Sequence, residues 1–380
     1  MSEAFITKVE KYMPNAPVSN DEMEGRLGLI NGNESKSRGL ILRNNGIKTR
    51  YYALDEQGYK THNNAQLASL AAQRLFENNP SGIEDIDLLT TGTSSPDVIQ
   101  PSHALMVHGE LGVSKNIETM AAHGTCNAGM LSLKYAYLSV LAGEAKNAVN
   151  VASEVFSSWM TAKNFQSEID KRKEIEENPY IAFEKDFLRW MLSDGAVAAL
   201  IQDKPNTTGV SLKIDWIDVK SFANELETCM YAGCVKNNDG SVTGWREMSL
   251  QDQMLSSVFS LKQDAKLLQK NIVEKGGMHL KEIVEKRNLD INSIDYFLPH
   301  LSSMFFKKPI FQSLADIGID IPESKWFLNL PKVGNVGAAS GMLMTEELFN
   351  RGTLVSGNKI LMMIPESARF SYTYVLLSVV

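Results

Sequence analysis

The chain contains two stretches that follow the same order of local patterns, and this internal repeat restricts the folds that it can adopt. Residues 124–154 read as a turn of small residues, a helix, a glycine-containing loop, an apolar strand and a closing glutamate, and residues 334–366 repeat that order. Upstream, residues 86–95 are matched by residues 294–303, and an amphipathic stretch precedes each of them. Because only two copies are present, the repeat indicates a pair of βα units rather than a solenoid.

Strands that alternate with helices predict an α/β fold, in which parallel or mixed sheets are covered by helices. Residues 205–209 (PNTTG) are a run of turn formers. We therefore expect an N-terminal half, residues 1–205, and a C-terminal half, residues 206–380. Apolar periodicity predicts strands at 4–9, 86–89, 148–152 and, after a turn at 194–195, within 191–202. It predicts helices at 64–76, 101–111 and 250–275. The charged segment 168–177 is expected to be a solvated helix.

Cys126 stands where the first copy passes from its small-residue turn into its helix. The helix is marked by apolar residues at Met130, Leu133 and Tyr137, the spacing of one buried face. At a helix N-terminus, unpaired N–H groups and the helix dipole favour negative charge, so a thiolate would form more easily there. Cys126 is therefore a candidate nucleophile. The alternative is a buried, unreactive thiol, which is the commoner fate of a cysteine.

Two further candidates, His300 and Asn335, each follow an apolar strand-like run of the second half. In open α/β folds, sites form at the carboxyl ends of strands, and two similar halves that face each other would bring both residues close to Cys126. His300 could transfer a proton near neutral pH, and Asn335 could donate an amide N–H to a developing enolate. The alternatives are a structural histidine and a helix-capping asparagine. His123 is a competing base.

Three cationic residues, Arg43, Lys48 and Arg50, lie close together around a turn in the N-terminal half. This loop could bind the phosphate of a substrate arm, or it could be an ordinary solvated loop. Thr93, at the end of the strand-like run that starts at residue 86, is a further candidate for substrate binding.

The composition narrows the classes of function. A net charge of −7 and a pI near 5.5 argue against a broad nucleic-acid surface, because phosphate binding needs a basic face. No apolar run reaches the length of a membrane span and no signal-peptide pattern is visible, so we expect a cytoplasmic protein. The three cysteines, Cys126, Cys229 and Cys234, fit a reducing compartment. Cys229 and Cys234 are a weak metal signal, and we expect them to be structural.

Five motifs together resemble the ketosynthase III-type condensing enzymes of the thiolase superfamily, over essentially the whole chain. They are residues 45–50 (NGIKTR), 122–129 (AHGTCNAG), 193–196 (SDGA), 299–300 (PH) and 334–340 (GNVGAAS). The resemblance implies a thiolase-like five-layered α-β-α-β-α fold of two similar halves, assembled as a homodimer. The internal repeat agrees with such a fold.

The resemblance also implies a role for each candidate. Cys126 would be the nucleophile that takes an acyl group, and His300 with Asn335 would stabilise the enolate of the second substrate. No metal or redox cofactor would be needed, because the substrates arrive on the phosphopantetheine of an acyl carrier protein or of CoA. The cationic loop would then face the phosphopantetheine or the acidic carrier.

The chain departs from the family pattern at two places. The family often has His-Gln-Ala-Asn where residues 300–303 read His-Leu-Ser-Ser. Before its last strand, the family has a glycine-rich turn whose backbone N–H helps to form the first oxyanion hole, and here Arg369 stands where a glycine is expected. The exchange would alter the local φ angle and the space around the site. It indicates a specialised pocket, with Arg369 as a candidate substrate contact.

Residues 14–22 and 42–52 are similar to a subgroup found with dialkylresorcinol and flexirubin pigment pathways. A member of that subgroup would join an acyl thioester with a β-ketoacyl thioester by Claisen condensation and close the product into a 1,3-cyclohexanedione. The alternatives are a fatty-acid initiating ketosynthase III, which uses acetyl-CoA and malonyl-carrier, and a non-condensing acyltransferase on the same fold. A non-catalytic partner subunit would have no need of Cys126, His300 and Asn335 together.

Overall fold

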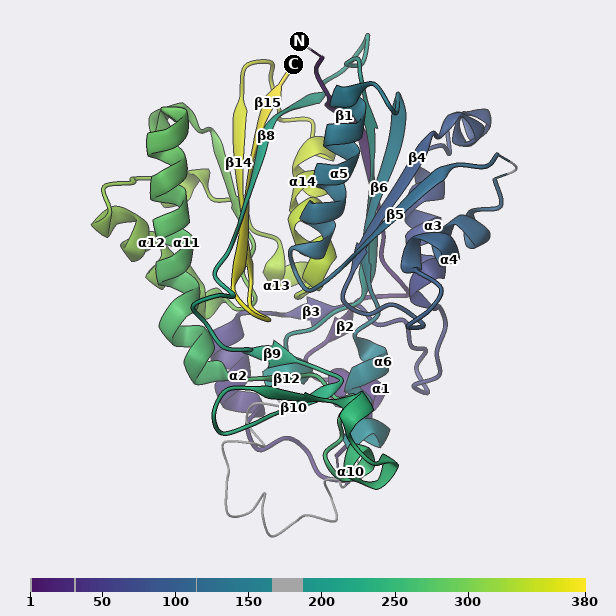
Figure 1. Cartoon of the computed structure of the whole chain (residues 1–380), viewed down its shortest axis with the longest axis vertical. Helices are drawn as coiled ribbons and strands as arrows, with labels where there is room; N and C mark the ends of the chain where they lie inside the picture. The colour runs from purple at the N-terminus through teal and green to yellow at the C-terminus, as the bar shows by residue number, and fades with distance from the viewer. Residues whose placement is uncertain (1, 31, 114, 166–186) are drawn as a thin grey trace.

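The computed structural model describes residues 2–30, 32–113, 115–165 and 187–380 of the 380-residue chain (Figure 1). The charged segment 168–177, for which we expected a helix, lies outside the described residues. Within these ranges, no helix is both long enough and apolar enough to cross a membrane.

The described elements form five layers in the order helix, sheet, helix, sheet, helix, as the resemblance implied (Figure 1). Nine of the described strands join in one mixed sheet, which folds around a middle layer of helices. In spatial order these strands are β13 (Tyr296–Pro299), β14 (Lys359–Glu366), β15 (Ser371–Val379), β8 (Leu212–Ser221), β1 (Phe5–Tyr12), β7 (Gly195–Gln202), β6 (Asn147–Glu154), β4 (Leu88–Thr93) and β5 (Glu118–His123).

The strand pairings repeat between the two sides of this sheet. On one side, β4 is parallel to β6, β6 is antiparallel to β7, and β7 is antiparallel to β1. On the other side, β13 is parallel to β14, β14 is antiparallel to β15, and β15 is antiparallel to β8. The two sides meet where β1 pairs with both β7 and β8. The boundary between residues 205 and 206 stays a prediction.

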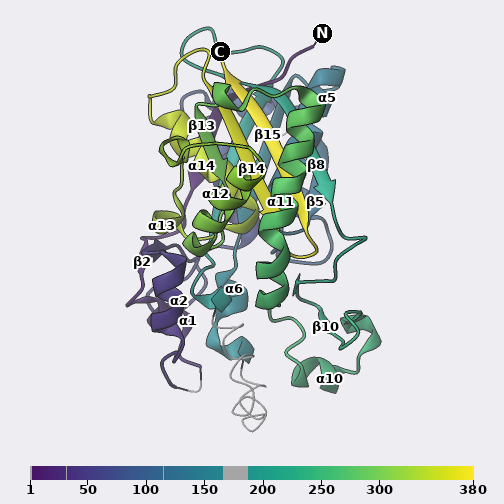
Figure 2. The ribbon, with the colours of Figure 1, turned by 90° about the vertical axis from the view of Figure 1, so that its left-hand side faces the viewer.

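Helices cover both outer faces and fill the middle layer. α3 (Asn64–Arg74) and α4 (His103–Leu111) lie on one outer face (Figure 1). α11 (Ala265–Arg287) and α12 (Lys307–Asp316) lie on the other, where Figure 2 shows them across β14 and β15. α5 (Ala128–Ala142) and α14 (Ser340–Asn350) form the middle layer, and their buried Met130, Leu133 and Leu343 pack against both sides of the sheet.

Close backbone contacts fix the start of α5 in this layer. A Cβ atom at Gly129 would lie 2.3 Å from the carbonyl oxygen of Ala338, and a Cβ at Gly92 would lie 2.3 Å from the carbonyl oxygen of Ala128. Only glycine permits such an approach. The helix N-terminus that follows Cys126 is therefore held against β4 and against the segment that leads into α14.

Short elements cover the carboxyl ends of the parallel strands, at the bottom of Figure 1, while both chain termini lie at the opposite end. The strands and helices of this cover are β2 (Val18–Ser19), β3 (Thr49–Arg50), β9 (Met230–Tyr231), β10 (Cys234–Lys236), β11 (Val242–Gly244), β12 (Lys262–Gln263), α1 (Met23–Leu27), α2 (Arg38–Asn45), α6 (Ser157–Met160) and α10 (Leu250–Leu255). α13 (Leu330–Val333) precedes Asn335, and short 3-10 helices occur at Pro80–Asp85, Ala162–Phe165, Trp245–Glu247, Ile291–Ser293, Met304–Phe306, Glu323–Lys325 and Gly337–Ala339.

The strands predicted at 4–9, 86–89, 148–152 and 191–202 and the helices predicted at 64–76 and 101–111 are confirmed as β1, β4, β6, β7, α3 and α4. The single helix predicted at 250–275 is wrong. α10 ends at Leu255, Ser257 has a φ of 45°, and β12 intervenes before the long helix α11. That helix starts after Asp264, whose carboxylate caps it by accepting a hydrogen bond from the N–H of Leu267 at 2.9 Å. Val258 and Leu261, which lie between the two helices, are both buried. The apolar periodicity therefore continues across the break, and the sequence pattern did not show that the helix ends.

Candidate active site

Cys126, His300 and Asn335 line one buried cavity beneath the cover of short elements. Each comes from a different place in the chain, since Cys126 lies between β5 and α5, His300 follows β13, and Asn335 follows α13. The structure thus brings the three predicted catalytic residues together. His123, the competing base, is exposed at the end of β5 and is not among the described residues that line the cavity.

The rest of the cavity wall is largely apolar. Its apolar side chains are Phe156, Leu188, Met191, Leu192, Met230, Leu268, Ile272 and Pro365. Its other members are Thr125, Gln263, Ser302, Gly337 and Ser367. An apolar cavity with a few polar side chains suits a ligand with a hydrocarbon part and a small number of polar atoms.

Cys126 lies directly before α5, as predicted, but its thiol is not activated in the resting protein. Burial raises the pKa of Cys126, and the nearby carboxylates of Glu366 and Glu154 raise it further. The backbone N–H of Cys126 acts in the opposite direction. The expectation of an easily formed thiolate is therefore wrong, because burial, followed by the charges of two carboxylates, raises the pKa of Cys126.

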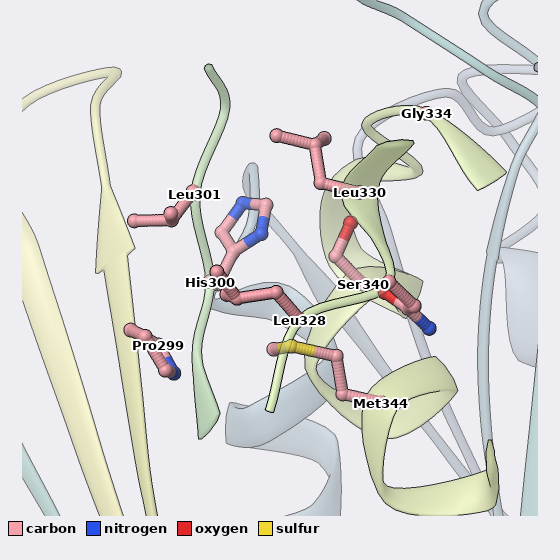
Figure 3. Close-up of a pocket in the computed structure, with 9 residues that line it drawn as sticks. Pro299, His300, Leu301, Leu328, Leu330, Gly334, Ser340 and Met344 are labelled. Carbon is pink, nitrogen blue, oxygen red and sulfur yellow. The ribbon is translucent and has the colours of Figure 1, made fainter. Parts of the chain in front are cut away.

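His300 is a neutral imidazole at neutral pH. It is 4% exposed, and burial lowers its pKa to about 4. Its backbone N–H donates to the carbonyl of Met363 on β14 at 2.8 Å, whereas its ring has no hydrogen-bond partner among the described residues. Figure 3 shows the ring beside Leu328, Leu330 and Ser340, and these residues line a second, smaller cavity together with His300.

Asn335 is oriented by its own helix start. Its Oδ1 accepts the backbone N–H of Gly337 at 3.0 Å and lies 3.5 Å from the hydroxyl of Ser340. Because an N–H group can bond only to the oxygen of the amide, Oδ1 must face Gly337. The Nδ2 group then points the other way and has no partner among the described residues, so it can donate to a ligand in the cavity.

Two buried glutamates form reciprocal contacts between the halves. Glu154, at the end of β6, accepts the backbone N–H of Ala338 at 3.1 Å, directly before α14. Glu366, at the end of β14, accepts a hydrogen bond from the hydroxyl of Thr125, which directly precedes Cys126. Burial raises the pKa of Glu154 to about 7. Sequence analysis assigned these residues no role, although the glutamate that closes each copy of the repeat was the available signal.

Comparisons with known proteins find similarity to ketosynthase III enzymes. Residues 284–364 match the family model described as 3-oxoacyl-[acyl-carrier-protein] synthase III, C terminal. The β-ketoacyl-[acyl-carrier-protein] synthase III of a type A strain of Clostridium perfringens is 26% identical over 365 residues, which cover 95% of each chain. The chain is thus similar over nearly its whole length to a β-ketoacyl-[acyl-carrier-protein] synthase III, and its C-terminal part matches the model of that family.

Solved structures share the thiolase-like fold over nearly the whole chain. The tetronic acid condensing enzyme AbyA1 superimposes with a TM-score of 0.74 at 18% identity, covering 99% of each chain. The 3-oxoacyl-[acyl-carrier-protein] synthase III of Aquifex aeolicus gives 0.70 at 20% identity, again covering 99% of each. A variant of OleA from Xanthomonas campestris, solved with bound lauric acid and lauroyl-CoA, gives 0.71 at 19% identity with the same coverage.

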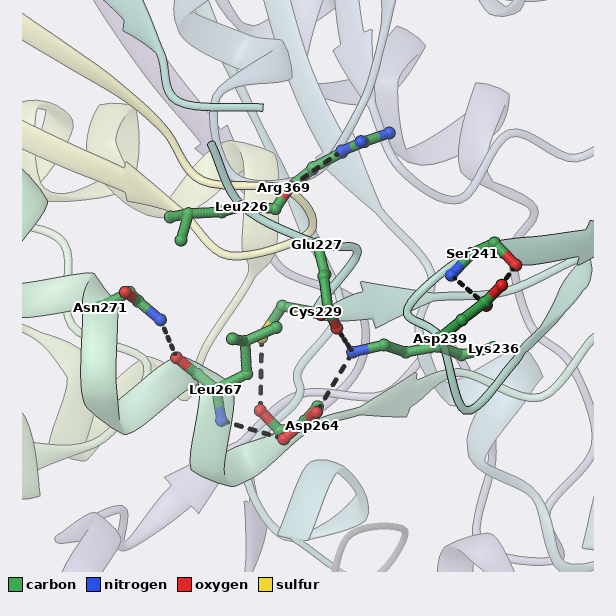
Figure 4. Close-up of polar contacts among 10 residues, drawn as sticks. All are labelled: Leu226, Glu227, Cys229, Lys236, Asp239, Ser241, Asp264, Leu267, Asn271 and Arg369. Carbon is green, nitrogen blue, oxygen red and sulfur yellow. Dashed lines mark hydrogen bonds and ion pairs between the residues drawn. The ribbon is translucent and has the colours of Figure 1, made fainter. Parts of the chain in front are cut away.

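The turn between β14 and β15 contains Arg369, the residue for which we predicted a substrate contact. Pro365 and Ser367 line the cavity, but Arg369 is exposed and donates from Nε to the carbonyl of Leu226 at 3.2 Å (Figure 4). The positive φ, 59°, falls on the buried Phe370 and not on Arg369. The structure therefore places the predicted contact Arg369 outside the cavity, and the unusual backbone one residue later.

The three residues of the cationic loop do not converge. Arg43 lies in the last turn of α2 and is exposed, and Lys48 is exposed beyond it. Arg50 is buried and donates to Oδ1 of Asn20 at 2.6 Å and to the carbonyl of Trp190 at 3.1 Å. Burial lowers the pKa of Arg50. None of the three is among the described residues that line the cavity, and Arg50 instead joins two segments of the cover.

The other candidates take part in internal contacts. Thr93 is buried, accepts from Nδ2 of Asn64 at 2.9 Å and donates to Glu154 at 3.2 Å, away from the cavity wall. Cys229 is buried and donates to the carbonyl of Asp264 at 3.3 Å (Figure 4). The part of the chain that the structure describes contains no cluster of three or more metal-ligating side chains.

Proposed function

We propose that this protein is a ketosynthase III-type condensing enzyme that joins acyl thioesters and forms carbon–carbon bonds through an acyl group on Cys126. The observation that carries the proposal is the meeting of Cys126, His300 and Asn335 in one cavity with a mainly apolar wall. A thiol nucleophile and two hydrogen-bond donors for an enolate are what such a condensation requires.

In the first half-reaction, Sγ of Cys126 attacks the carbonyl carbon of an acyl thioester. An S–C bond forms, and the carrier or CoA thiolate leaves. Because the pKa of Cys126 is raised and that of His300 is lowered to about 4, the resting pair is a neutral thiol and a neutral imidazole. The thiol proton therefore moves only as the S–C bond forms, and the departing thiolate takes it up.

In the second half-reaction, the α-carbon of another thioester becomes a nucleophile by loss of carbon dioxide or of a proton. The enolate oxygen accepts hydrogen bonds from the N–H of the neutral His300 and from Nδ2 of Asn335. The α-carbon attacks the acyl group, the new C–C bond forms, and the bond between the acyl carbon and Sγ of Cys126 breaks. The released thiolate then takes up a proton from solvent, which replaces the proton that the α-carbon lost to solvent in the deprotonation route. No step needs a metal or redox cofactor, because the electron pairs come from the substrates.

The finer proposal is that an acyl thioester is joined with a β-ketoacyl thioester and that the product closes to a 1,3-cyclohexanedione, the precursor of dialkylresorcinols. Three features support it: the similarity of residues 14–22 and 42–52 to that subgroup, the replacement of the glycine-rich turn, and a wall of eight apolar side chains. A fatty-acid initiating ketosynthase III, which would condense acetyl-CoA with malonyl-carrier, is the second candidate, favoured by the name of the Clostridium perfringens relative.

We further propose an acyl carrier protein or CoA as the substrate carrier, and a homodimer as the assembly. β5 is an edge strand of the sheet. Beside it, α5 exposes Leu131, Tyr135 and Leu138, which are 37%, 39% and 49% exposed. A second copy of the chain would pair with the strand edge and cover these side chains.

Mass spectrometry of the products tests the proposal. The purified protein is given a medium-chain acyl thioester and a β-ketoacyl thioester, alongside a Cys126→Ala variant. We expect a product with the mass of a cyclic dione from the unchanged protein and neither product nor covalent acylation from the variant. A linear β-ketoacyl product formed only with malonyl thioester would return the protein to the initiating class. Acyl label on another residue of Cys126→Ala would overturn the nucleophile assignment.

A further inference from the structure

Gln263 is a buried polar side chain in the wall of the cavity that holds Cys126, and none of the steps above uses it. It lies on the short strand β12, opposite Met230 of β9, and both side chains line the cavity. Gln263 is 4% exposed. Placing an amide in a largely apolar wall is costly unless its polar atoms find partners.

One end of this amide already has a partner. Nε2 of Gln263 donates to the hydroxyl of Ser367 at 3.1 Å, which links β12 to the turn between β14 and β15. A side-chain amide offers two N–H donors and a carbonyl acceptor. Its Oε1 and its second N–H have no partner among the described residues. Because the Ser367 hydroxyl can donate as well as accept, it can hold either end of the amide, and the other end still faces the cavity.

We propose that Gln263 selects an acyl chain that carries an oxygen function near the thioester, with a 3-oxoacyl thioester as the ligand class. This inference deepens the proposed function and rests on it. A saturated chain would leave the amide without a partner in the apolar wall, whereas a ketone oxygen on the chain can accept the free N–H. Sites built to bond a polar substrate atom discriminate strongly against the analogue that lacks it.

The competing explanation is that Gln263 only ties the cover to the turn after β14. The two explanations differ in what Ser367 does. If the tie is the whole role, then Ser367→Ala and Gln263→Met should change the protein alike and should not distinguish between ligands. If Gln263 donates a hydrogen bond to the ligand, Ser367→Ala should keep the preference for the 3-oxoacyl ligand, because the amide of Gln263 remains.

Binding is measured in a Cys126→Ala background, where no thioester is consumed. Isothermal titration calorimetry compares octanoyl-CoA with 3-oxooctanoyl-CoA, in that background alone and with Gln263→Met or Ser367→Ala added. We expect the 3-oxo ligand to bind about three- to tenfold more tightly, the range of one neutral hydrogen bond. Gln263→Met should bring the two affinities to within about twofold, and Ser367→Ala should keep the preference.

Gln312→Met serves as a matched control, because Gln312 is an exposed glutamine on α12 that donates to Asp316. Thermal unfolding of each variant separates lost folding from lost recognition. Equal affinities in the Cys126→Ala background, or a preference that survives Gln263→Met, would overturn the role of Gln263. A wild-type protein that binds 3-oxooctanoyl-CoA selectively but condenses nothing would overturn the proposed function and leave this inference standing.

Discussion

Cys126 lies close to two carboxylates that come from opposite halves of the chain. Glu366 accepts a hydrogen bond from the hydroxyl of Thr125, which directly precedes Cys126. Glu154 accepts a hydrogen bond from the backbone N–H of Ala338, in the segment before α14. After burial, which has the larger effect, both carboxylates raise the pKa of the thiol. In the resting state the proposed nucleophile is therefore a neutral thiol, and a neutral thiol reacts slowly with electrophiles.

Alkylation of Cys126 tests this arrangement. Between pH 7 and pH 9, the rate of labelling by iodoacetamide should rise about tenfold per pH unit without a plateau, because the thiol stays protonated over this range. Glu366→Gln keeps the side-chain shape and removes one of the two negative charges that raise the pKa of Cys126. It should therefore increase the labelling rate several-fold at pH 8, followed by peptide mass spectrometry so that Cys229 and Cys234 are counted separately.

Glu118→Gln is the matched control, because Glu118 is exposed at the start of β5 and bonds to the hydroxyl of Tyr135. Its labelling rate should equal that of the unchanged protein. A plateau below pH 8 in the unchanged protein would show that the thiolate forms readily and would contradict the raised pKa. An unaltered rate in Glu366→Gln would remove Glu366 as a cause of it.

Among the helices, α5 depends most on close backbone contact. Gly129 is the point where its first turn meets Ala338, and a methyl group there would lie 2.3 Å from a carbonyl oxygen and 2.9 Å from Cβ of Ala152. Neither neighbour is a flexible side-chain end, so the helix itself would have to shift. Because Cys126 directly precedes this helix, such a shift would also move the thiol.

Gly129→Ala should lower the free energy of unfolding by about 2–4 kcal/mol, the cost of overpacking a rigid site. Gly109→Ala provides the comparison, because Gly109 lies in α4 and a Cβ there would meet nothing within 4 Å. That change should raise stability by about 0.5–1 kcal/mol, since alanine favours the helix. Urea unfolding measures both. Equal effects of the two substitutions would contradict the tight contact at Gly129.

Helices and strands with a regular period were predictable, and the cover was not. α3 has seven buried positions and a capping box at Asn63, so its sequence indicates both which face is buried and where the helix starts. The cover consists of two- and three-residue strands such as β9 and β12, which are too short to show a period. The wrong prediction for residues 250–275 concerns this cover, and Gln263, which sequence analysis did not identify as a cavity residue, also lies in it.

For the complete chain, the proposed homodimer can be tested directly. Light scattering after size exclusion should give twice the chain mass of 42.2 kDa. Leu138→Glu places a charge on the exposed apolar face of α5 and should shift the protein toward the monomer, because a buried, unpaired carboxylate opposes association. Val355→Glu, at a residue that is 61% exposed in the loop before β14, should leave the mass unchanged. A monomeric unchanged protein, or a dimer that tolerates Leu138→Glu, would contradict the interface.

Local patterns in the chain were sufficient to predict the repeated βα units, the α/β class and the three residues that now share a cavity. Such patterns are local because helix and strand periods, turn residues and short motifs span only a few neighbouring positions. Burial and long-range charge are not local. Arg43, Lys48 and Arg50 are close in sequence, yet only the last is buried. The contact that sets Glu366 beside Thr125 joins residues 241 positions apart. The pKa of the thiol and the presence of Gln263 in the cavity were therefore decided by the packing of distant segments, because desolvation and Coulomb interactions depend on distance in space and not along the chain.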